Sequence, residues 1–177
     1  MVPGGPIMSA LSFSYYVTAP GDINHSRITD LEVVHVGGTT HLYSGTRYDG
    51  VLRQWDIADG RLAIGDNQPF AGGVIAGGTG GIATLEFGGI SSLLVGGSAG
   101  GALQTIQLLP NGDFGASTVL GTLPSRFDGF QHGATLTLDD GSQAVFGSLV
   151  GEVGLARLRF DADGILRNQS ILQDAQL

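Results

Sequence analysis

Two short polar segments of the chain bring histidine and carboxylate side chains close together in sequence. The segments are "APGDINHSRITD" (19–30) and "LPSRFDGFQHG" (123–133), and their candidate binding residues are Asp22, His25, Asp30, Arg126, Asp128 and His132. A histidine beside a carboxylate can ligate a metal ion, or it can act as a general base that the carboxylate orients. The first candidate pair is therefore His132 with Asp128, and the second is His25 with Asp22.

The same residues also have a purely structural explanation. Asp and Asn side chains ahead of a strand commonly accept hydrogen bonds from backbone N–H groups and so cap a turn. His25 and His132 lie 107 residues apart, which does not match two intervals of the 52-residue period described below. Turn capping is the competing interpretation for both segments, and no residue is assigned a catalytic role.

A third acidic stretch, "DADG" (161–164), resembles the start of an oxygen-rich calcium loop, in which carboxylates fall at alternate positions. The residues that follow, "ILRNQ", supply no late bidentate carboxylate. A hairpin turn is favoured here, because Asp-Gly dipeptides are common in such turns. We therefore expect no cofactor, with calcium at this stretch as the alternative.

The elements that position these segments are short strands that recur with a period of 52 residues. The period is set by three dipeptides that suit two-residue type I′ hairpin turns: Asp59-Gly60, Asn111-Gly112 and Asp163-Gly164. An apolar residue follows two positions beyond each glycine: Leu62, Phe114 and Leu166. Four runs that alternate apolar and polar residues accompany each turn, and they predict four strands per unit.

This pattern predicts an all-β chain of three four-stranded antiparallel units, at about residues 28–75, 79–126 and 130–177. An extension (1–9) and a further strand (10–18) precede them. Four short strands per repeat are typical of β-propeller blades, and an all-β sandwich is the alternative. Closed propellers usually have four to eight blades. We therefore expect an open arc that self-associates, or part of a larger ring.

The stretch "ITDLEVVHVGGTTHLYSGTRYDGVLRQWDIADGRL" resembles the blades in the propeller regions of bacterial calcium-binding exoproteins of the repeats-in-toxin type. It is more remotely similar to lactonase-like β-propellers. The resemblance covers about residues 28–173, and glycine, turn and apolar positions carry it, so it implies a fold rather than an activity. The calcium-binding nonapeptide "GGxGxDxUx" of such exoproteins does not occur in the sequence.

The aromatic residues suggest two further sites. Trp55, the only tryptophan, invites comparison with a WD repeat or a sugar-stacking site, and Phe127 with Phe130 is a second lead for a carbohydrate platform. One period after Trp55 lie Ile106 or Gln107, so the aromatic character does not recur. We interpret Trp55 as a residue that packs a blade.

Composition limits the classes of partner. Sixteen acidic and eight basic residues give a net charge of −8, which disfavours a nucleic acid or an anionic membrane as partner. The chain has no cysteine, so neither disulfides nor thiolate catalysis is available to it. No apolar stretch is long enough to span a membrane, and the first residues lack the positive region of a classical signal peptide.

These observations favour a non-catalytic structural or interaction module, in a larger secreted or surface assembly. We expect self-association or protein partners and an extracellular or cell-surface location. The alternative is a lactonase-like or metal-dependent hydrolase with a site in the loops between blades.

Overall fold

The computed structural model describes residues 28–46, 51–58, 61–69, 78–97, 102–122, 129–149 and 154–172. Within these ranges the chain forms twelve strands and no helix. The predicted extension and strand before residue 28 lie outside the described residues. The expectation of an all-β chain with three antiparallel sheets is confirmed.

Each sheet is a meander whose four strands pair in chain order. Sheet 1 contains β1 (Ile28–Val36), β2 (Thr39–Thr46), β3 (Val51–Ala58) and β4 (Arg61–Pro69). Sheet 2 contains β5 (Thr79–Phe87), β6 (Ile90–Gly97), β7 (Ala102–Leu108) and β8 (Phe114–Thr122). Sheet 3 contains β9 (Phe130–Thr137), β10 (Gln143–Leu149), β11 (Leu155–Phe160) and β12 (Leu166–Leu172). The alternation of apolar and polar residues thus placed the strands correctly to within about three residues.

The predicted type I′ geometry is wrong for the described X-Gly turns. Gly112 has a φ of +88°, whereas Asn111 is not among the residues with positive φ. The Gly112 N–H donates to the Leu109 carbonyl, and the Leu109 N–H donates to the Asp113 carbonyl. This is a three-residue loop, a type I turn closed by a left-handed glycine, and Pro110 favours it because its fixed φ suits the first central position of a type I turn.

The loop at 161–165 has the same two hydrogen bonds, from Gly164 to Asp161 and from Asp161 to Ile165. The prediction that "DADG" forms a hairpin turn is therefore confirmed. Two-residue turns with both φ values positive occur instead at Gly37-Gly38 and Gly88-Gly89. Residues 59 and 60 lie outside the described residues.

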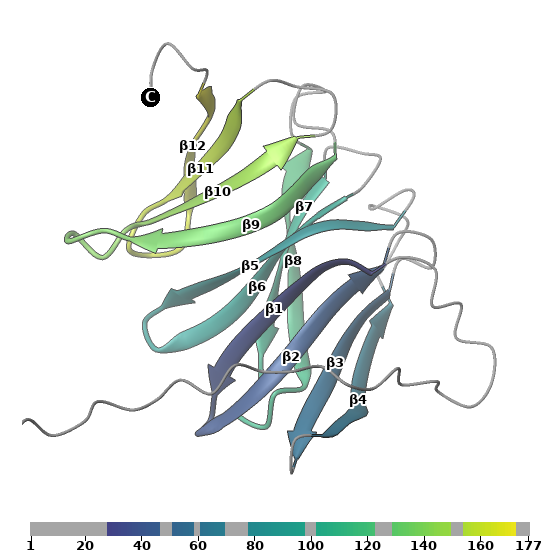
Figure 1. The fold of residues 1–177 in the computed structure, drawn as a ribbon. Helices are drawn as coiled ribbons and strands as arrows, with labels where there is room; N and C mark the ends of the chain where they lie inside the picture. Colours follow the sequence, from purple (N-terminus) through teal and green to yellow (C-terminus); the bar gives the residue numbers. More distant parts are fainter. Residues whose placement is uncertain are drawn as a thin grey trace, which may run out of the picture.

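The three sheets lie face to face in chain order (Figure 1). We call the face of each sheet on the side of the earlier sheet its upstream face, and the opposite one its downstream face. Val34, Tyr43 and Leu52 on the downstream face of sheet 1 pack against the upstream face of sheet 2. The downstream face of sheet 2 packs in turn on the upstream face of sheet 3.

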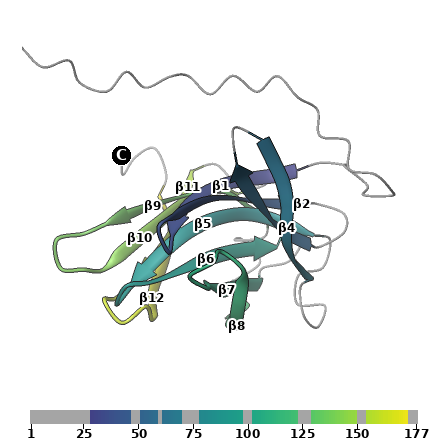
Figure 2. The same cartoon turned by 90° about the horizontal axis from the view of Figure 1, so that it is seen from below.

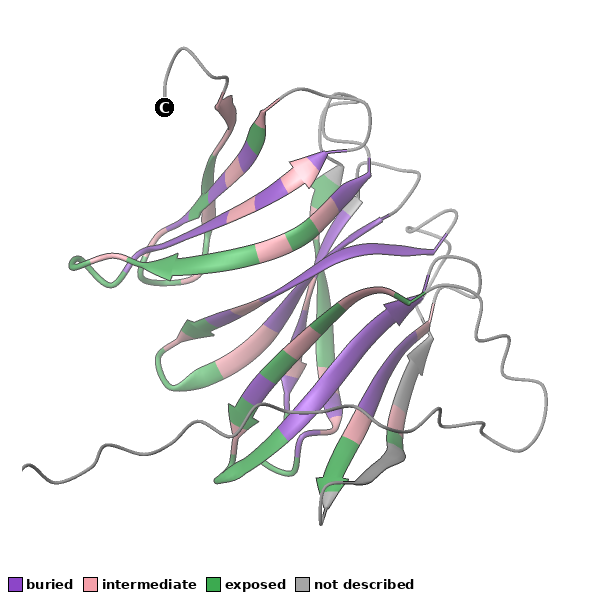
Figure 3. Ribbon diagram, in the orientation of Figure 1, coloured by how far each residue is buried: buried purple, intermediate pink, exposed green. Residues whose placement is uncertain are grey.

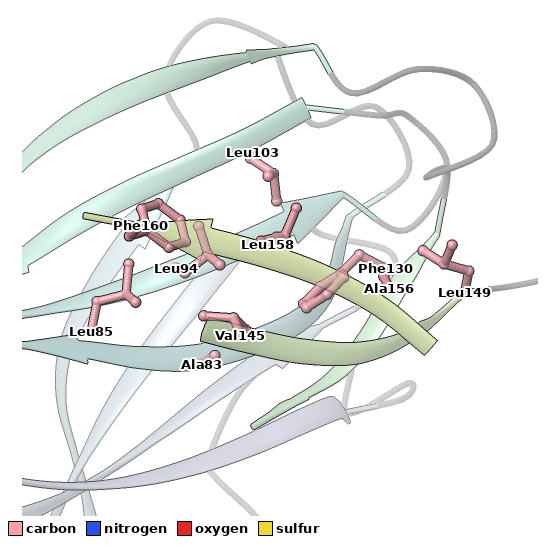
Figure 4. Packing of buried hydrophobic residues seen from close by; sticks show 10 residues of the cluster. All are labelled: Ala83, Leu85, Leu94, Leu103, Phe130, Val145, Leu149, Ala156, Leu158 and Phe160. Carbon is pink, nitrogen blue, oxygen red and sulfur yellow. The ribbon is translucent and has the colours of Figure 1, made fainter. Parts of the chain in front are cut away.

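The core between sheets 2 and 3 is the larger of the two. Leu85, Leu94 and Leu103 of sheet 2 point toward Leu158 and Phe160 of sheet 3 (Figure 4). The same core holds Phe130, which is only 1% exposed. A role for Phe130 in a carbohydrate platform is therefore wrong, because its ring is covered by its neighbours.

The sheets approach one another most closely along their first strands, β1, β5 and β9, while their fourth strands diverge (Figures 1 and 2). β5 is buried over its first half, whereas β9 is exposed over most of its length (Figure 3). A Cβ atom on Gly133 would lie 2.6 Å from the Ala83 Cβ and 2.7 Å from the Ile82 carbonyl oxygen. Glycine at this position therefore lets the backbones of β5 and β9 come together.

Candidate functional site

Two of the predicted binding residues, Asp30 and His132, lie within the described residues. Asp30 is near the start of β1 and His132 is near the start of β9. The other four predicted residues lie outside the described residues: Asp22, His25, Arg126 and Asp128. The predicted pairing of His132 with Asp128 therefore stays a prediction.

The structure brings Asp30 and His132 together, although 102 residues separate them in sequence. The His132 Nδ1 lies 3.5 Å from the Asp30 Oδ1. The Asp30 side chain is 13% exposed and that of His132 is 67% exposed. The pair therefore joins a sheltered carboxylate to an imidazole that solvent can reach.

The Asp30 carboxylate is held in place by two backbone donors. Its Oδ2 accepts a hydrogen bond of 2.8 Å from the Ile82 N–H, and its Oδ1 accepts one of 3.0 Å from the Leu31 N–H. These two bonds fix the orientation of the carboxylate. Asp30 thus binds the free edge of β5 in the next sheet and also faces the imidazole, and only its bond from the Leu31 N–H is local, as turn capping predicts.

The His132 backbone is in the left-handed region, with a φ of +52°. This is the only positive φ of a residue other than glycine among the described residues. It occurs at a bulge, since the register of β9 with β10 shifts between Phe146 and Ser148. Such conformations are uncommon outside glycine, and they persist where the surrounding structure imposes them.

Gly81 helps the strands that carry Asp30 and His132 to come together. A Cβ atom on Gly81 would lie 2.9 Å from the Gln131 carbonyl carbon and 2.9 Å from the Phe130 Cδ1, so glycine lets the start of β9 approach β5 closely. Asp30, Gly81 and His132 lie at intervals of 51 residues. A period of 51 along the first strands is the sequence signal that would have paired Asp30 with His132, and the 52-residue period of the X-Gly turns concealed it.

An ordered carboxylate beside an imidazole can fix the ring orientation for proton transfer, or the two can supply two metal ligands. Within the described part of the chain, no group of three or more His, Asp or Glu side chains could hold a metal ion. The described geometry therefore fits an oriented histidine better than a complete metal centre.

A second carboxylate, Glu32, also bridges sheets 1 and 2. Its Oε1 accepts hydrogen bonds from the Thr84 N–H, at 3.1 Å, and from the Thr84 Oγ1, at 2.6 Å. Burial raises the pKa of Glu32, and the hydrogen bonds from Thr84 oppose that effect. The Thr135 hydroxyl donates to the Thr84 carbonyl from the other side. Sequence patterns gave no signal for Glu32, because its role depends on how the two sheets pack.

A buried polar cluster lies on the same downstream face of sheet 1. His41 is 3% exposed, and its Nδ1 lies 3.1 Å from the Asp56 Oδ1 and 2.8 Å from the Gln54 Nε2. The Tyr43 hydroxyl donates a 2.7 Å hydrogen bond to the Gly112 carbonyl. Burial, together with nearby carboxylates, raises the pKa of Tyr43. This cluster holds the β7–β8 hairpin against sheet 1, so its contacts serve packing.

One cavity, of about 480 Å³, opens between the outer strands of sheets 2 and 3. Leu103, Leu120 and Leu166 line it, together with Arg167. The Arg167 guanidinium is paired with Asp161 at 2.6 Å. The cavity is distant in the fold from the first strands that carry Asp30 and His132.

No protein-family model matches the chain, and no curated protein matches it in sequence. Among the described residues, the structure contains no helix long and apolar enough to cross a lipid bilayer.

Proposed function

We propose that the protein is a non-catalytic assembly module built of propeller-type blades, in a larger secreted or surface assembly. The observation that carries this proposal concerns the two ends of the stack: among the described residues, no sheet covers the upstream face of sheet 1 or the downstream face of sheet 3. The other two faces of each kind are covered by a neighbouring sheet. The acidic balance of the sequence, which keeps a protein soluble, supports a location outside the cell.

The upstream face of sheet 1 exposes large apolar side chains. Leu31 is 49% exposed, Val33 is 63% exposed and Ile57 is 38% exposed. On the downstream face of sheet 3, Leu136 is 53% exposed and Leu155 is 38% exposed. Apolar surface grouped on the face of a sheet is characteristic of interaction sites.

The free edge of β1 supports the same proposal. The Gly37-Gly38 turn makes Val36 and Thr39 a hydrogen-bonded pair, so the Val33 N–H points away from β2. In β5 the corresponding N–H, that of Thr84, is bonded by the Glu32 carboxylate. An edge strand with available backbone donors favours contact with another chain.

The concentration dependence of thermal unfolding tests this proposal. If the end faces are covered on assembly, Tm rises with protein concentration by mass action, and sedimentation shows a species heavier than the 18.2 kDa chain. A stable monomer whose Tm is the same at every concentration would refute the module.

The second candidate is the hydrolase, which the contact between His132 and Asp30 favours. In that function Asp30 would orient the imidazole, and His132 would activate water or ligate a metal ion. Elemental analysis of the purified protein separates the candidates. Stoichiometric metal that is lost in His132→Ala and kept in His35→Ala, a control on an exposed histidine of β1, would support the hydrolase.

A further inference from the structure

We propose that the partner of each uncovered face is a second copy of this chain, bound head to tail. In this arrangement the downstream face of sheet 3 in one copy covers the upstream face of sheet 1 in the other, and the contact occurs twice. The inference rests on the assembly function proposed above, and it adds the identity and orientation of the partner.

The downstream faces of the three sheets carry matching apolar residues at matching positions. The strand registers align three sets: Val34, Leu85 and Leu136; Tyr43, Leu94 and Phe146; and Leu52, Leu103 and Leu155. In sheets 1 and 2 these residues are at most 5% exposed, because the next sheet covers them. In sheet 3, Leu136 and Leu155 are exposed. Sheet 3 therefore presents the surface that its predecessors use to bind a following sheet.

The upstream faces match in the same way. The registers align Leu42, Leu93 and Val145; Trp55, Ile106 and Leu158; and Ile57, Leu108 and Phe160. Ile57 is 38% exposed in sheet 1, whereas Leu108 is 3% exposed and Phe160 is fully buried. Leu42 is only 8% exposed, so the open part of this face is the one that carries Leu31, Val33 and Ile57, and this part is what sheet 1 presents to a preceding sheet.

Both contacts inside the chain join a downstream face to an upstream face. The two free faces of one chain are one of each kind, so two copies can satisfy all four faces without a new type of contact. Three sheets from each copy make six, which lies within the usual range of closed propellers. A contact between unlike faces that closes after two copies gives a discrete dimer rather than a filament.

Charge disfavours the alternative in which the downstream face of sheet 3 pairs with its own copy. Arg157 and Arg159 lie on the downstream face of sheet 3, as their pairing with Phe146 and Ala144 shows. Arg159 is already paired with Asp140 at 3.4 Å, so the charge that opposes pairing of this face with its own copy is that of Arg157, which would meet a second Arg157 in a contact that excludes water. On the described part of the upstream face of sheet 1, the one guanidinium is that of Arg53, which is already 9% exposed.

Two exposed substitutions test the orientation of the contact. Val33→Asp alters only the upstream face of sheet 1, and Leu136→Arg alters only the downstream face of sheet 3. Both side chains are more than half exposed, so neither change disturbs the core of the chain. Val119→Asp, at an exposed valine of β8 in sheet 2, is the matched control.

Mass by light scattering and sedimentation is the readout. We expect the wild type and the control to be dimers with twice the mass of the 18.2 kDa chain, and each single variant to be a monomer with the mass of one chain. An equimolar mixture of the two variants should regain the dimer. One of its two contacts joins two natural faces, and the other joins a new carboxylate to a new guanidinium.

The other outcomes are equally informative. If only one variant dissociates and the mixture stays unchanged, like faces pair, which overturns this inference and leaves the assembly function standing. A ladder of larger species would overturn closure after two copies. A concentration-independent, stable monomer would overturn both the inference and the proposed function.

Discussion

Substitutions of Glu32 can separate two contributions to the stability of the contact between sheets 1 and 2: that of its hydrogen bonds and that of its charge. Its carboxylate accepts two hydrogen bonds from Thr84, and burial raises its pKa. Glu32→Gln keeps an acceptor oxygen in place and removes the charge. Glu32→Ala removes both, so the difference between the two variants isolates the hydrogen bonds.

Glu32→Ala leaves the Thr84 N–H and hydroxyl without their acceptor at a half-buried position. A buried donor without a partner costs about 1–3 kcal/mol, and the free energy of unfolding should fall by about 1 kcal/mol because water can reach this partly exposed site. Glu32→Gln should be more stable than the wild type at neutral pH, since it avoids the unfavourable burial of a charge.

The sign of the pH effect follows from the raised pKa. The folded protein holds the Glu32 proton more tightly than the unfolded chain does, so this group contributes stability below its ordinary pKa of 4.5. That contribution is lost as the pH rises through the higher pKa of the folded state. The stability of Glu32→Gln relative to the wild type should therefore grow from acid to neutral pH.

Urea unfolding at pH 4 and at pH 7, at one fixed protein concentration, measures the three proteins. Comparing variants at each pH cancels the contributions of the other carboxylates. A Glu32→Gln protein that is less stable than the wild type at pH 7, or a difference that does not change with pH, would refute the burial argument. Introducing Thr84→Val into the wild type and into Glu32→Gln would then show whether the Thr84 hydroxyl donates a hydrogen bond to residue 32.

Three further substitutions test local features of the packing. Gly133→Ala should lower the free energy of unfolding by about 1–3 kcal/mol, because its Cβ meets the backbone of β5, while Gly115→Ala, which meets chiefly a flexible leucine side chain, should change it little. His132→Gly should raise it by about 1 kcal/mol, because it relieves the left-handed backbone; a loss of stability would show that the contact with Asp30 matters more. Tyr43→Phe should lower it by about 1 kcal/mol, because the buried carbonyl of Gly112 loses its donor, and unchanged urea midpoints would contradict that bond.

The strands were predictable from sequence because each buries one face at a time, which imposes alternation. The run "ALQTIQL" coincides with β7, Ala102–Leu108. In β1 the side chain of His35 is exposed and that of Val34 is buried, as the alternation of polar and apolar residues requires. The hairpin type was not predictable from the Asn-Gly dipeptide alone, because Pro110 before it selects a longer loop.

The contact between Asp30 and His132 was hidden by loop length. The first hairpin of sheets 1 and 2 turns on two glycines, whereas Leu138 pairs with Ser142 across a three-residue loop in sheet 3. The extra residue shifts every later position by one, so the period of 52 read from Gly112 and Gly164 does not apply to the first strands. The bonds of Glu32 to Thr84 depend on sheet packing, which strand periodicity does not encode.

The order of the three sheets also determines where the chain opens. Among the described residues, sheet 2 packs against another sheet on both faces, while sheets 1 and 3 each do so on one. Amide protons of β6 and β7 should therefore exchange with solvent only on global unfolding, and those of sheet 1 in smaller opening events. Sheet 1 should open first, because the apolar core that joins it to sheet 2 is smaller than the core between sheets 2 and 3. In the proposed dimer, covering the end faces would slow exchange at both ends and make the protection nearly uniform.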